Sequence, residues 1–375
     1  MTSWILLAVG LVSAALGLLT VFRSPDWIDW RLPVAVDQFG YVIAVVPLAT
    51  GLLAAFLPAS RGAPAAAACL AGAAGFALLV QPCVQAWFIG RGLPRRLEAQ
   101  FGRAAIQGPA FSFPGLFRRF AMPVAKTTWT YSGDLQLDFY AALGRSPSPC
   151  VIFIHGGGWD SGDRDEIPLF NCWLASRGYA MAAISYRLAP GATWPAQRDD
   201  VAAAVAFVKS RAAGWGVDPS RLVIMGRSAG GQIAEASAYA FHDPAVRGVV
   251  ALYAPADMNF AYAFSREDDV IKSPDLMRKF LGGTPETARA AYDSASAILL
   301  VGPGTPPTLM VHGVIDTLVW HRQSERLSAR LSEAGVPNLL VSLPWASHAL
   351  EFNLSGPSGQ LTRYSVEWFL QRICR

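Results

Sequence analysis

Three apolar stretches without charged side chains dominate the beginning of the chain. No Asp, Glu, Lys or Arg occurs in residues 1–22, between Asp37 and Arg61, or between Arg61 and Arg91. A helix that crosses the hydrocarbon core of a bilayer needs about 20 apolar residues. We therefore expect a membrane region over residues 1–90. Its three transmembrane helices are predicted at about 4–22, 39–57 and 65–89.

Two other interpretations of these stretches are open. The first stretch has the length of a signal peptide, but no Lys or Arg precedes it and no clear A-x-A cleavage site follows. The third is rich in Ala and Gly, which weakens its hydropathy although small residues also let membrane helices pack closely. A water-soluble all-α domain is the remaining alternative.

From residue 127 onward the pattern changes to short apolar runs separated by amphipathic segments. Residues 127–131 and 135–141 alternate like a hairpin. The buried runs predict strands at 151–154, 180–185, 222–225, 249–253, 308–311 and 339–343. Helical periodicity lies between and after them, at 169–177, 196–213, 229–240, 320–334 and 359–372. Alternating strands and helices predict an α/β domain over 127–375, a mostly parallel sheet with helices on both faces.

Two segments fit neither pattern. Residues 91–126 contain Pro, Gly and Arg and are expected to form a juxtamembrane linker that has room for one amphipathic helix. Residues 257–302 are too long for an ordinary connection and carry several aromatic residues. We expect a helical excursion near the mouth of a site there. A solvated surface insertion is the alternative.

Composition and charge support a membrane setting. Charged residues make up 15% of the chain, against about 25% in a typical soluble domain. Basic residues gather after the third apolar stretch, at Arg91, Arg95, Arg96, Arg103, Arg118, Arg119 and Lys126. Such flanking charge favours a cytoplasmic position for the domain that follows, in a multi-pass protein of a bacterial inner membrane. A basic stripe on anionic headgroups is a compatible reading. The net charge of +4 gives no reason to expect nucleic acid as a partner.

The strongest chemical signal is the sequence LVIMGRSAGG at 222–231. It places G-x-S-x-G between a predicted strand and a predicted helix, which is the nucleophile-elbow pattern. A sharp turn there lifts Ser228 Oγ off the end of the sheet. The glycines on either side avoid collisions with the neighbouring strand and helix. Ser228 is therefore the candidate nucleophile.

A serine needs a base, and the base needs an orienting acid. His348 follows the last predicted strand, where its ring can reach over the sheet end. Asp316 follows the preceding strand, although it could instead cap the helix after it. The other downstream histidines are assigned structural or surface positions: His242, His312 and His321. The competing acids are Asp257, Asp293 and Glu351.

Three glycines in a row, Gly156, Gly157 and Gly158, follow the strand at 151–154. Glycine packs nothing, so a run at a strand end indicates that a ligand approaches the backbone closely. Acyl transfer places negative charge on a carbonyl oxygen, which backbone N–H groups stabilise. The amide of Ala229, after the nucleophile, is a further donor. We expect His155 to brace this loop and not to act as a second base.

Six motifs in order resemble α/β-hydrolase esterases related to hormone-sensitive lipase, and most closely their bacterial feruloyl-esterase-like branch. They are HGGGW, SYRLAPGATWPAQRDDVAAAVAFV, GVDPSRLVIMGRSAGG, FLGGTPE, PPTLMVHGVIDTLV and SHALEF. The resemblance covers about 127–375. It implies an α/β-hydrolase fold and carboxylic-ester hydrolysis without cofactor or metal. The implied roles are a triad of Ser228, Asp316 and His348, and an oxyanion hole of Gly157, Gly158 and Ala229.

One departure from the family pattern lies beside the nucleophile. The elbow usually reads GDSAGG, and here Arg227 replaces the acidic residue. Arg227 could recognise an anionic substrate or pair with a nearby carboxylate. Trp159 and Arg227 are the candidate substrate-binding side chains.

The sequence therefore predicts a membrane-anchored serine esterase that acts on a small-molecule or lipid ester. Two alternatives stay open. The same triad could transfer the acyl group to an alcohol or amine, which would make the protein an acyltransferase. The domain could also be a non-catalytic membrane sensor with a hydrolase-like fold.

Overall fold

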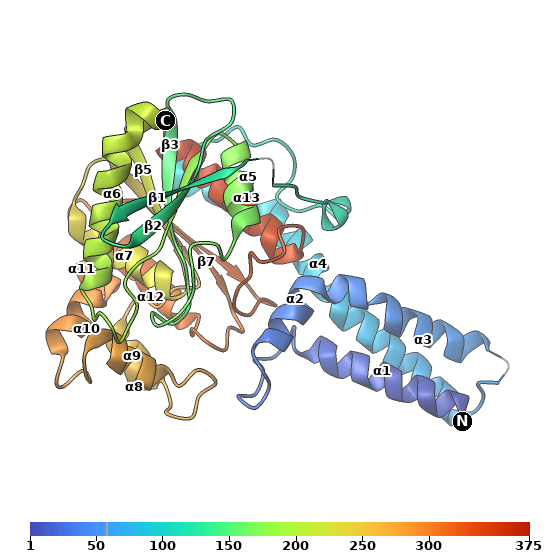
Figure 1. The fold of residues 1–375 in the computed structure, drawn as a ribbon. Helices are drawn as coiled ribbons and strands as arrows, with labels where there is room; N and C mark the ends of the chain where they lie inside the picture. The colour runs from blue at the N-terminus through green and yellow to red at the C-terminus, as the bar shows by residue number, and fades with distance from the viewer. Residues whose placement is uncertain (58, 123) are drawn as a thin grey trace.

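The computed structural model describes residues 1–57, 59–122 and 124–375. An α/β domain forms one part of the molecule, and a slender bundle of N-terminal helices projects from it (Figure 1). Helix α4, Ala63–Phe101, belongs to both parts, because it begins in the bundle and ends against the α/β domain.

The α/β domain is built on one eight-stranded sheet with the order β1-β2-β4-β3-β5-β6-β7-β8. Strand β2 pairs antiparallel with β1 and β4, and all other pairings are parallel. The strands are β1 Lys126–Ser132, β2 Leu135–Tyr140, β3 Ser148–Ile154, β4 Ala180–Ile184, β5 Val217–Arg227, β6 Val246–Leu252, β7 Thr308–Gly313 and β8 Asn338–Leu343. Each strand predicted from the sequence is present, and the mostly parallel sheet is confirmed.

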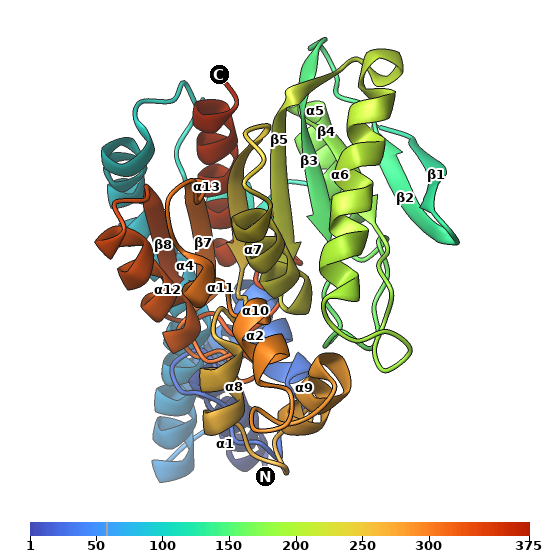
Figure 2. The same cartoon turned by 90° about the vertical axis from the view of Figure 1, so that its left-hand side faces the viewer.

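Helices cover both faces of this sheet (Figure 2). On one face lie α6 Ala196–Trp215, α7 Ala229–Phe241 and α12 Arg322–Glu333. On the other lie α5 Pro168–Ser176, α13 Pro357–Ile373 and the second half of α4. Strand β4 is apolar throughout, β3 is apolar from Cys150 to Ile154, and both are buried along their whole length, as expected for strands covered on both sides.

The N-terminal helices are α1 Thr2–Leu18, α2 Arg31–Ile43 and α3 Val45–Phe56, which pack with the first half of α4. Small residues allow the close approach. A Cβ on Gly10 would lie 2.9 Å from the Cβ of Ala71, and one on Gly72 would lie 2.7 Å from the carbonyl oxygen of Pro47. Membrane helices commonly associate through such contacts.

The prediction of three long transmembrane helices needs correction. Among the described residues, one helix, α4, is long and apolar enough to cross a membrane. Helices α2 and α3 pass the same test only as a pair, and they are bent by 50°. Pro47 sits in the first turn of α3 and has no N–H to donate to the preceding turn, which explains the break. Helix α1 is apolar but shorter, with 17 residues.

The expected linker over 91–126 begins with an amphipathic helix, and this helix is the continuation of α4. Helix α4 continues without interruption to Phe101. In this part of the helix Leu93 and Leu97 are fully buried, while the neighbouring arginines stay exposed. Apolar residues four apart form one helix face, and this face covers the sheet. Further along, Phe111 and Leu116 are buried in the same core, the second around a 3-10 turn at Pro114–Phe117. The boundary placed at residue 90 therefore cuts through a helix.

The irregular segment between β6 and β7 is helical, as expected. It contains α8 Met258–Phe264, α9 Ser273–Leu281, α10 Arg289–Ala295 and α11 Ala297–Leu300. These helices lie at the end of the domain to which the central strands point, beyond α7 and α12 (Figure 2).

Candidate active site

Ser228 occupies a strained turn between β5 and α7. Its backbone has φ 52° and ψ −126°, in the region that non-glycine residues rarely adopt. A Cβ on Gly226 would overlap the carbonyl oxygen of Gly230, and one on Gly230 would overlap that of His155. Both glycines are therefore required for the turn to sit against its neighbours. The elbow predicted from G-x-S-x-G is present in geometry.

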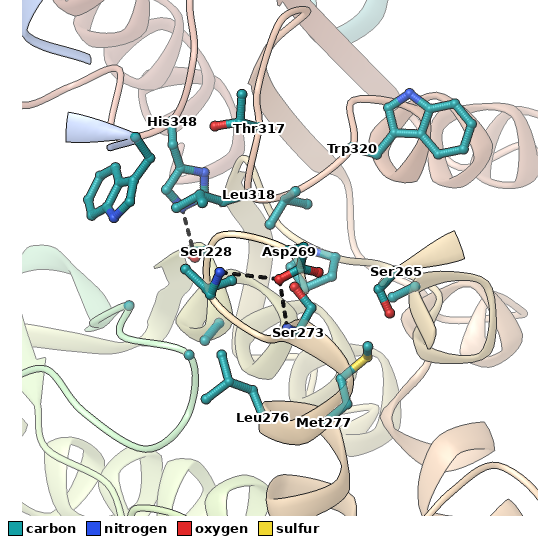
Figure 3. A pocket seen from close by; sticks show the side chains of 18 of the residues that line it. Ser228, Ser265, Asp269, Ser273, Leu276, Met277, Thr317, Leu318, Trp320 and His348 are labelled. Atoms are coloured by element: carbon teal, nitrogen blue, oxygen red, sulfur yellow. Dashed lines mark hydrogen bonds between the residues drawn. The ribbon is translucent and has the colours of Figure 1, made fainter. Parts of the chain in front are cut away.

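The structure brings together the three residues that the sequence singled out. His348 Nε2 lies 2.9 Å from Ser228 Oγ, and His348 Nδ1 lies 2.7 Å from Asp316 Oδ2. Figure 3 shows the hydrogen bond between Ser228 and His348 as a dashed line. Ser228 follows β5, Asp316 follows β7 and His348 follows β8, so the carboxyl ends of parallel strands assemble the group.

Asp316 is held as an anion. Its Oδ1 accepts the backbone N–H groups of Leu318 at 2.8 Å and Val319 at 3.0 Å. Burial by itself would raise the pKa of the Asp316 carboxyl. The attraction of His348 and the hydrogen bonds from His312 and His348 outweigh burial and hold this pKa well below its usual range.

The glycine loop lies directly beside the nucleophile. A Cβ on Gly156 would lie 3.4 Å from the Cβ of Ser228. Gly157 and Gly158 have φ values of +102° and +59°. The amide of Gly156 donates to Glu166 at 3.1 Å, whereas those of Gly157, Gly158 and Ala229 have no acceptor in the described parts of the chain. These three amides are free to serve a ligand.

Several side chains brace this loop from behind. His155 stacks on Tyr186 with ring centroids 4.3 Å apart, and its Nδ1 contacts the carbonyl oxygen of Gly156 at 2.7 Å. Burial lowers the pKa of His155, which favours the neutral ring. Trp159 borders the cavity, but its indole stacks on Phe280 of α9 and donates to Gln232 at 2.9 Å. His155 and Trp159 thus fix the loop's position.

Arg227 meets two carboxylates. Its Nη1 lies 2.9 Å from Glu166, and its Nε lies 2.9 Å from Glu351 and 2.7 Å from the hydroxyl of Tyr253. Of the two roles left open for Arg227, pairing with a nearby carboxylate is the one seen. Because Glu166 also accepts the Gly156 amide, Arg227 joins the glycine loop to the loop that carries His348.

The other candidates take structural positions. His312 contacts Ser324 and the carbonyl oxygen of Val319, which steadies the Asp316 loop. His321 contacts Ser342, and His242 ends α7 in a left-handed conformation. The competing acids bind elsewhere: Asp257 binds Arg326, Asp293 binds Arg289, and Glu351 binds Arg227.

A cavity of about 890 Å³ opens above Ser228. Its lining comes from the glycine loop, the loop after Asp316, helices α8 and α9, and the segment between α1 and α2. In Figure 3, Leu276, Met277, Leu318 and Trp320 surround the space near Ser228. The segment over 257–302 therefore contributes to the mouth of the site.

The model of the family BD-FAE matches residues 137–331, just over half of the chain. The chain belongs to the BD-FAE family.

Curated relatives of this BD-FAE family member carry esterase names. Esterase LipQ of Mycobacterium tuberculosis is 29% identical over 254 residues, covering 64% of this chain and 60% of LipQ. Esterase LipC of the same organism is 27% identical over 243 residues, with shares of 61% and 59%. The chain therefore spans about three fifths of these relatives. The resemblance to esterases related to hormone-sensitive lipase is confirmed, and the predicted enzyme class agrees with the relatives' names.

Solved structures confirm the α/β-hydrolase fold of the BD-FAE domain. A bacterial heroin esterase superposes with a TM-score of 0.59 at 20% identity, covering 78% of this chain and 93% of that one. Esterase LipW from Mycobacterium marinum superposes with a TM-score of 0.53 at 22% identity, with shares of 77% and 90%. At these identities the likeness concerns the fold.

The sequence did not identify the partners of Arg227. Glu166 and Tyr253 lie in segments without a recognisable motif, and Glu351 had been considered only as a competing acid. Arg227 itself could have indicated that such partners exist, since a buried cation requires an anionic partner.

Proposed function

We propose that this protein hydrolyses a carboxylic ester, with Ser228 as nucleophile, His348 as general base and Asp316 as the residue that orients the base. The observation that carries the proposal is the unbroken line of short contacts from Ser228 Oγ through His348 to Asp316. In the tautomer that fits these contacts, Nδ1 carries the proton and Nε2 accepts the serine proton.

The reaction follows from this arrangement. Ser228 Oγ attacks the ester carbonyl as its proton moves to His348 Nε2, and the amides of Gly157, Gly158 and Ala229 stabilise the oxyanion. His348 returns the proton to the departing alcohol, which leaves an acyl-enzyme. Water then attacks the acyl group while His348 takes its proton, and His348 passes that proton to Ser228 Oγ as the carboxylic acid departs. The serine, the histidine and the backbone amides supply every protein group that these reaction steps use, so the proposal requires no cofactor.

We also propose that the N-terminal helices anchor the enzyme in a membrane. Helix α1 buries Ser3, Gly10, Ser13 and Gly17 against its neighbours. The same helix exposes large apolar side chains: Trp4, Ile5, Val9, Leu11, Val12 and Leu18. A water-soluble helix buries its apolar face, so this reversed distribution fits lipid as the surrounding solvent. On this view α1, the bent pair α2–α3 and α4 each enter the bilayer.

The charge distribution supports a bacterial inner-membrane protein with a cytoplasmic catalytic domain, because basic residues follow the apolar part of α4. Fusions to the C-terminus test this orientation. Green fluorescent protein fluoresces and alkaline phosphatase is inactive if the domain faces the cytoplasm. The opposite pattern would place the domain on the other side.

The cavity supports a small-molecule or lipid ester as substrate. Its volume of about 890 Å³ falls in the usual range of ligand pockets, about 300–1,000 Å³. The lining near Ser228 is largely apolar, as Leu276, Met277 and Leu318 show, and suits an acyl chain (Figure 3). Arg266 and Asp26, 3.6 Å apart, add polar groups farther out.

A fluorophosphonate probe tests the proposed chemistry, because it reacts with activated serines. We expect stoichiometric labelling of the full-length protein in detergent, located by mass spectrometry to the peptide that carries Ser228. Labelling should be absent after heat denaturation. A native protein that resists the probe, or labelling at another serine, would overturn the proposal. Acyl transfer to an added alcohol faster than hydrolysis would redirect it to an acyltransferase.

A further inference from the structure

The N-terminal region reaches the two loops that carry the base and its orienting acid. Arg23, in the segment between α1 and α2, donates from Nη2 to the carbonyl oxygen of Thr317 at 3.2 Å, next to Asp316. The ring of Trp30 meets that of His348 edge-on, with centroids 6.3 Å apart. Arg23 and Trp30 also line the cavity above Ser228. The proposed anchor thus borders the proposed site.

The firmest of these contacts comes from Asp37 in α2. Its side chain is buried, with 1% of the residue's surface exposed. Asp37 Oδ2 accepts both the backbone N–H and the hydroxyl of Ser347, each at 2.7 Å. Asp37 Oδ1 accepts the amide of Gln38 at 2.9 Å. Ser347 directly precedes His348, so a carboxyl group from the N-terminal region holds the peptide next to the base.

The same helix holds the far end of the histidine loop. Gln38 Oε1 accepts the backbone N–H of Asn353 at 3.2 Å, and the Gln38 carbonyl oxygen accepts the Asn353 side chain at 2.9 Å. Between these two anchor points, at 347 and 353, the loop contains no helix or strand. Ala349, the residue after His348, has a φ of 53°. Helix α2 therefore supplies constraints that this loop does not generate itself.

We propose that Asp37 is a positioning residue for His348, so that the N-terminal helical region is a working part of the active site and not only its anchor. The inference rests on the proposed function, because it presumes that His348 is the base. It explains why an acidic residue is buried in α2, at the start of a charge-free stretch that extends to Arg61. A misplacement of a reacting group by about 1 Å costs about 100-fold in rate.

Two substitutions at Asp37 separate positioning from general support. Asp37→Leu keeps the branched shape of the side chain but leaves the Ser347 N–H and hydroxyl without an acceptor. Asp37→Asn keeps one carbonyl oxygen that can accept both. We expect kcat on p-nitrophenyl butyrate to fall about 100-fold in Asp37→Leu with KM within about twofold of wild type. In Asp37→Asn we expect recovery to within about tenfold of wild type.

The measurements use the full-length protein in detergent, with kcat expressed per active site titrated to completion by the fluorophosphonate. Asp29→Leu is the matched control, since this nearby side chain is 60% exposed and, within the described residues, has Arg31 as its only polar partner. We expect its kcat to be unchanged. Ser347→Ala removes one of the two bonds to Asp37 and should give a kcat between wild type and Asp37→Leu.

Wild-type kcat per titrated site in Asp37→Leu would overturn the inference, and so would equal losses in the Leu and Asn variants. If Asp37→Leu does not fold, Ser347→Ala decides, and wild-type kcat there would have the same meaning. The proposed function fails separately. Absence of Ser228 labelling in the wild type would refute that proposal, whereas labelled wild type with active Asp37→Leu would refute only the positioning role.

Discussion

The surroundings of Asp316 keep its carboxyl group ionised. Burial would raise the pKa of its carboxyl, but the attraction and hydrogen bonds of His348 and His312 outweigh burial and hold this pKa below the usual value. A carboxyl whose pKa is lower in the folded than in the unfolded chain stabilises the fold above the unfolded value, about 3.9. That stability is lost only as the pH falls through the lowered folded value. Asp316 therefore stays ionised across the range in which histidine titrates.

This arrangement predicts a simple pH dependence. The value of kcat/KM for p-nitrophenyl butyrate should fall on acidification between pH 8 and 5, because a protonated His348 cannot accept the serine proton. The limiting slope should be one, since Asp316 does not change its charge there. The reaction is followed at the isosbestic wavelength of p-nitrophenol. A flat profile from pH 8 to 5, or a slope of two, would be inconsistent with the assigned roles.

The three central residues could be inferred from the sequence because each follows a recognisable strand. Ser228, Asp316 and His348 occur in the expected chain order, and parallel strands bring their carboxyl ends to one edge. The contacts around them could not be inferred. Arg227 and Glu166 are 61 residues apart, and Asp37 and Ser347 are 310 apart. No local periodicity links such pairs, because only the packed fold makes them neighbours.

Helix α4 packs against the N-terminal helices with its first half and against the sheet with its second half. Its first half packs against α1 and α3 through small residues, and its second half covers the sheet with Leu93 and Leu97. The two halves offer a matched pair of glycines. A Cβ on Gly72 would lie 2.7 Å from the Pro47 carbonyl oxygen and 2.8 Å from the Gly51 nitrogen, whereas one on Gly92 would meet nothing within 4 Å.

We predict opposite effects of the same substitution at these glycines. Gly72→Ala should destabilise the protein by about 1–3 kcal/mol, because the backbones of α3 and α4 must separate. Gly92→Ala should be neutral or stabilise by about 0.5–1 kcal/mol, since alanine favours the helix. Thermal unfolding of the full-length protein in detergent measures both. Equal melting temperatures would show that the bundle is not packed as described.

At the level of helices and strands, the sequence predicted the α/β domain better than the N-terminal region. Short apolar strands bounded by glycines and turns can be recognised from the hydrophobic pattern of the sequence. The break between α2 and α3 and the continuation of α4 to Phe101 were harder to predict. The break follows from Pro47, which lies within a run of apolar residues that a hydropathy scale does not divide. The arginines after residue 90 give this segment the composition of a linker. In the structure they lie on the exposed side of a helix whose other side is buried.

The N-terminal helices and the α/β domain share a hydrophobic core and are not two independent units. Helix α4 contributes Ala86, Leu93 and Leu97 to the core beneath the sheet, and all three are fully buried. Helix α2 holds the loop of His348. A catalytic fragment that begins after α4 would expose the apolar face that this helix covers.

We therefore predict that the fragment 100–375 does not fold independently. Each buried leucine that is lost removes about 1.5–3 kcal/mol, a large share of a typical stability of 5–15 kcal/mol. Size-exclusion chromatography and circular dichroism should show aggregation and no cooperative melting. The fragment 63–375 keeps α4 and should be recovered folded in detergent. A monomeric 100–375 fragment that melts like the full-length protein would contradict the unified core.

The most direct test of the account compares Ser228→Ala with the wild type in the full-length protein. We predict that the variant keeps the wild-type melting temperature and loses hydrolysis of p-nitrophenyl butyrate by at least about 1,000-fold in kcat/KM, because no other group can form the acyl-enzyme. A folded Ser228→Ala protein that hydrolyses the ester at the wild-type rate would contradict it.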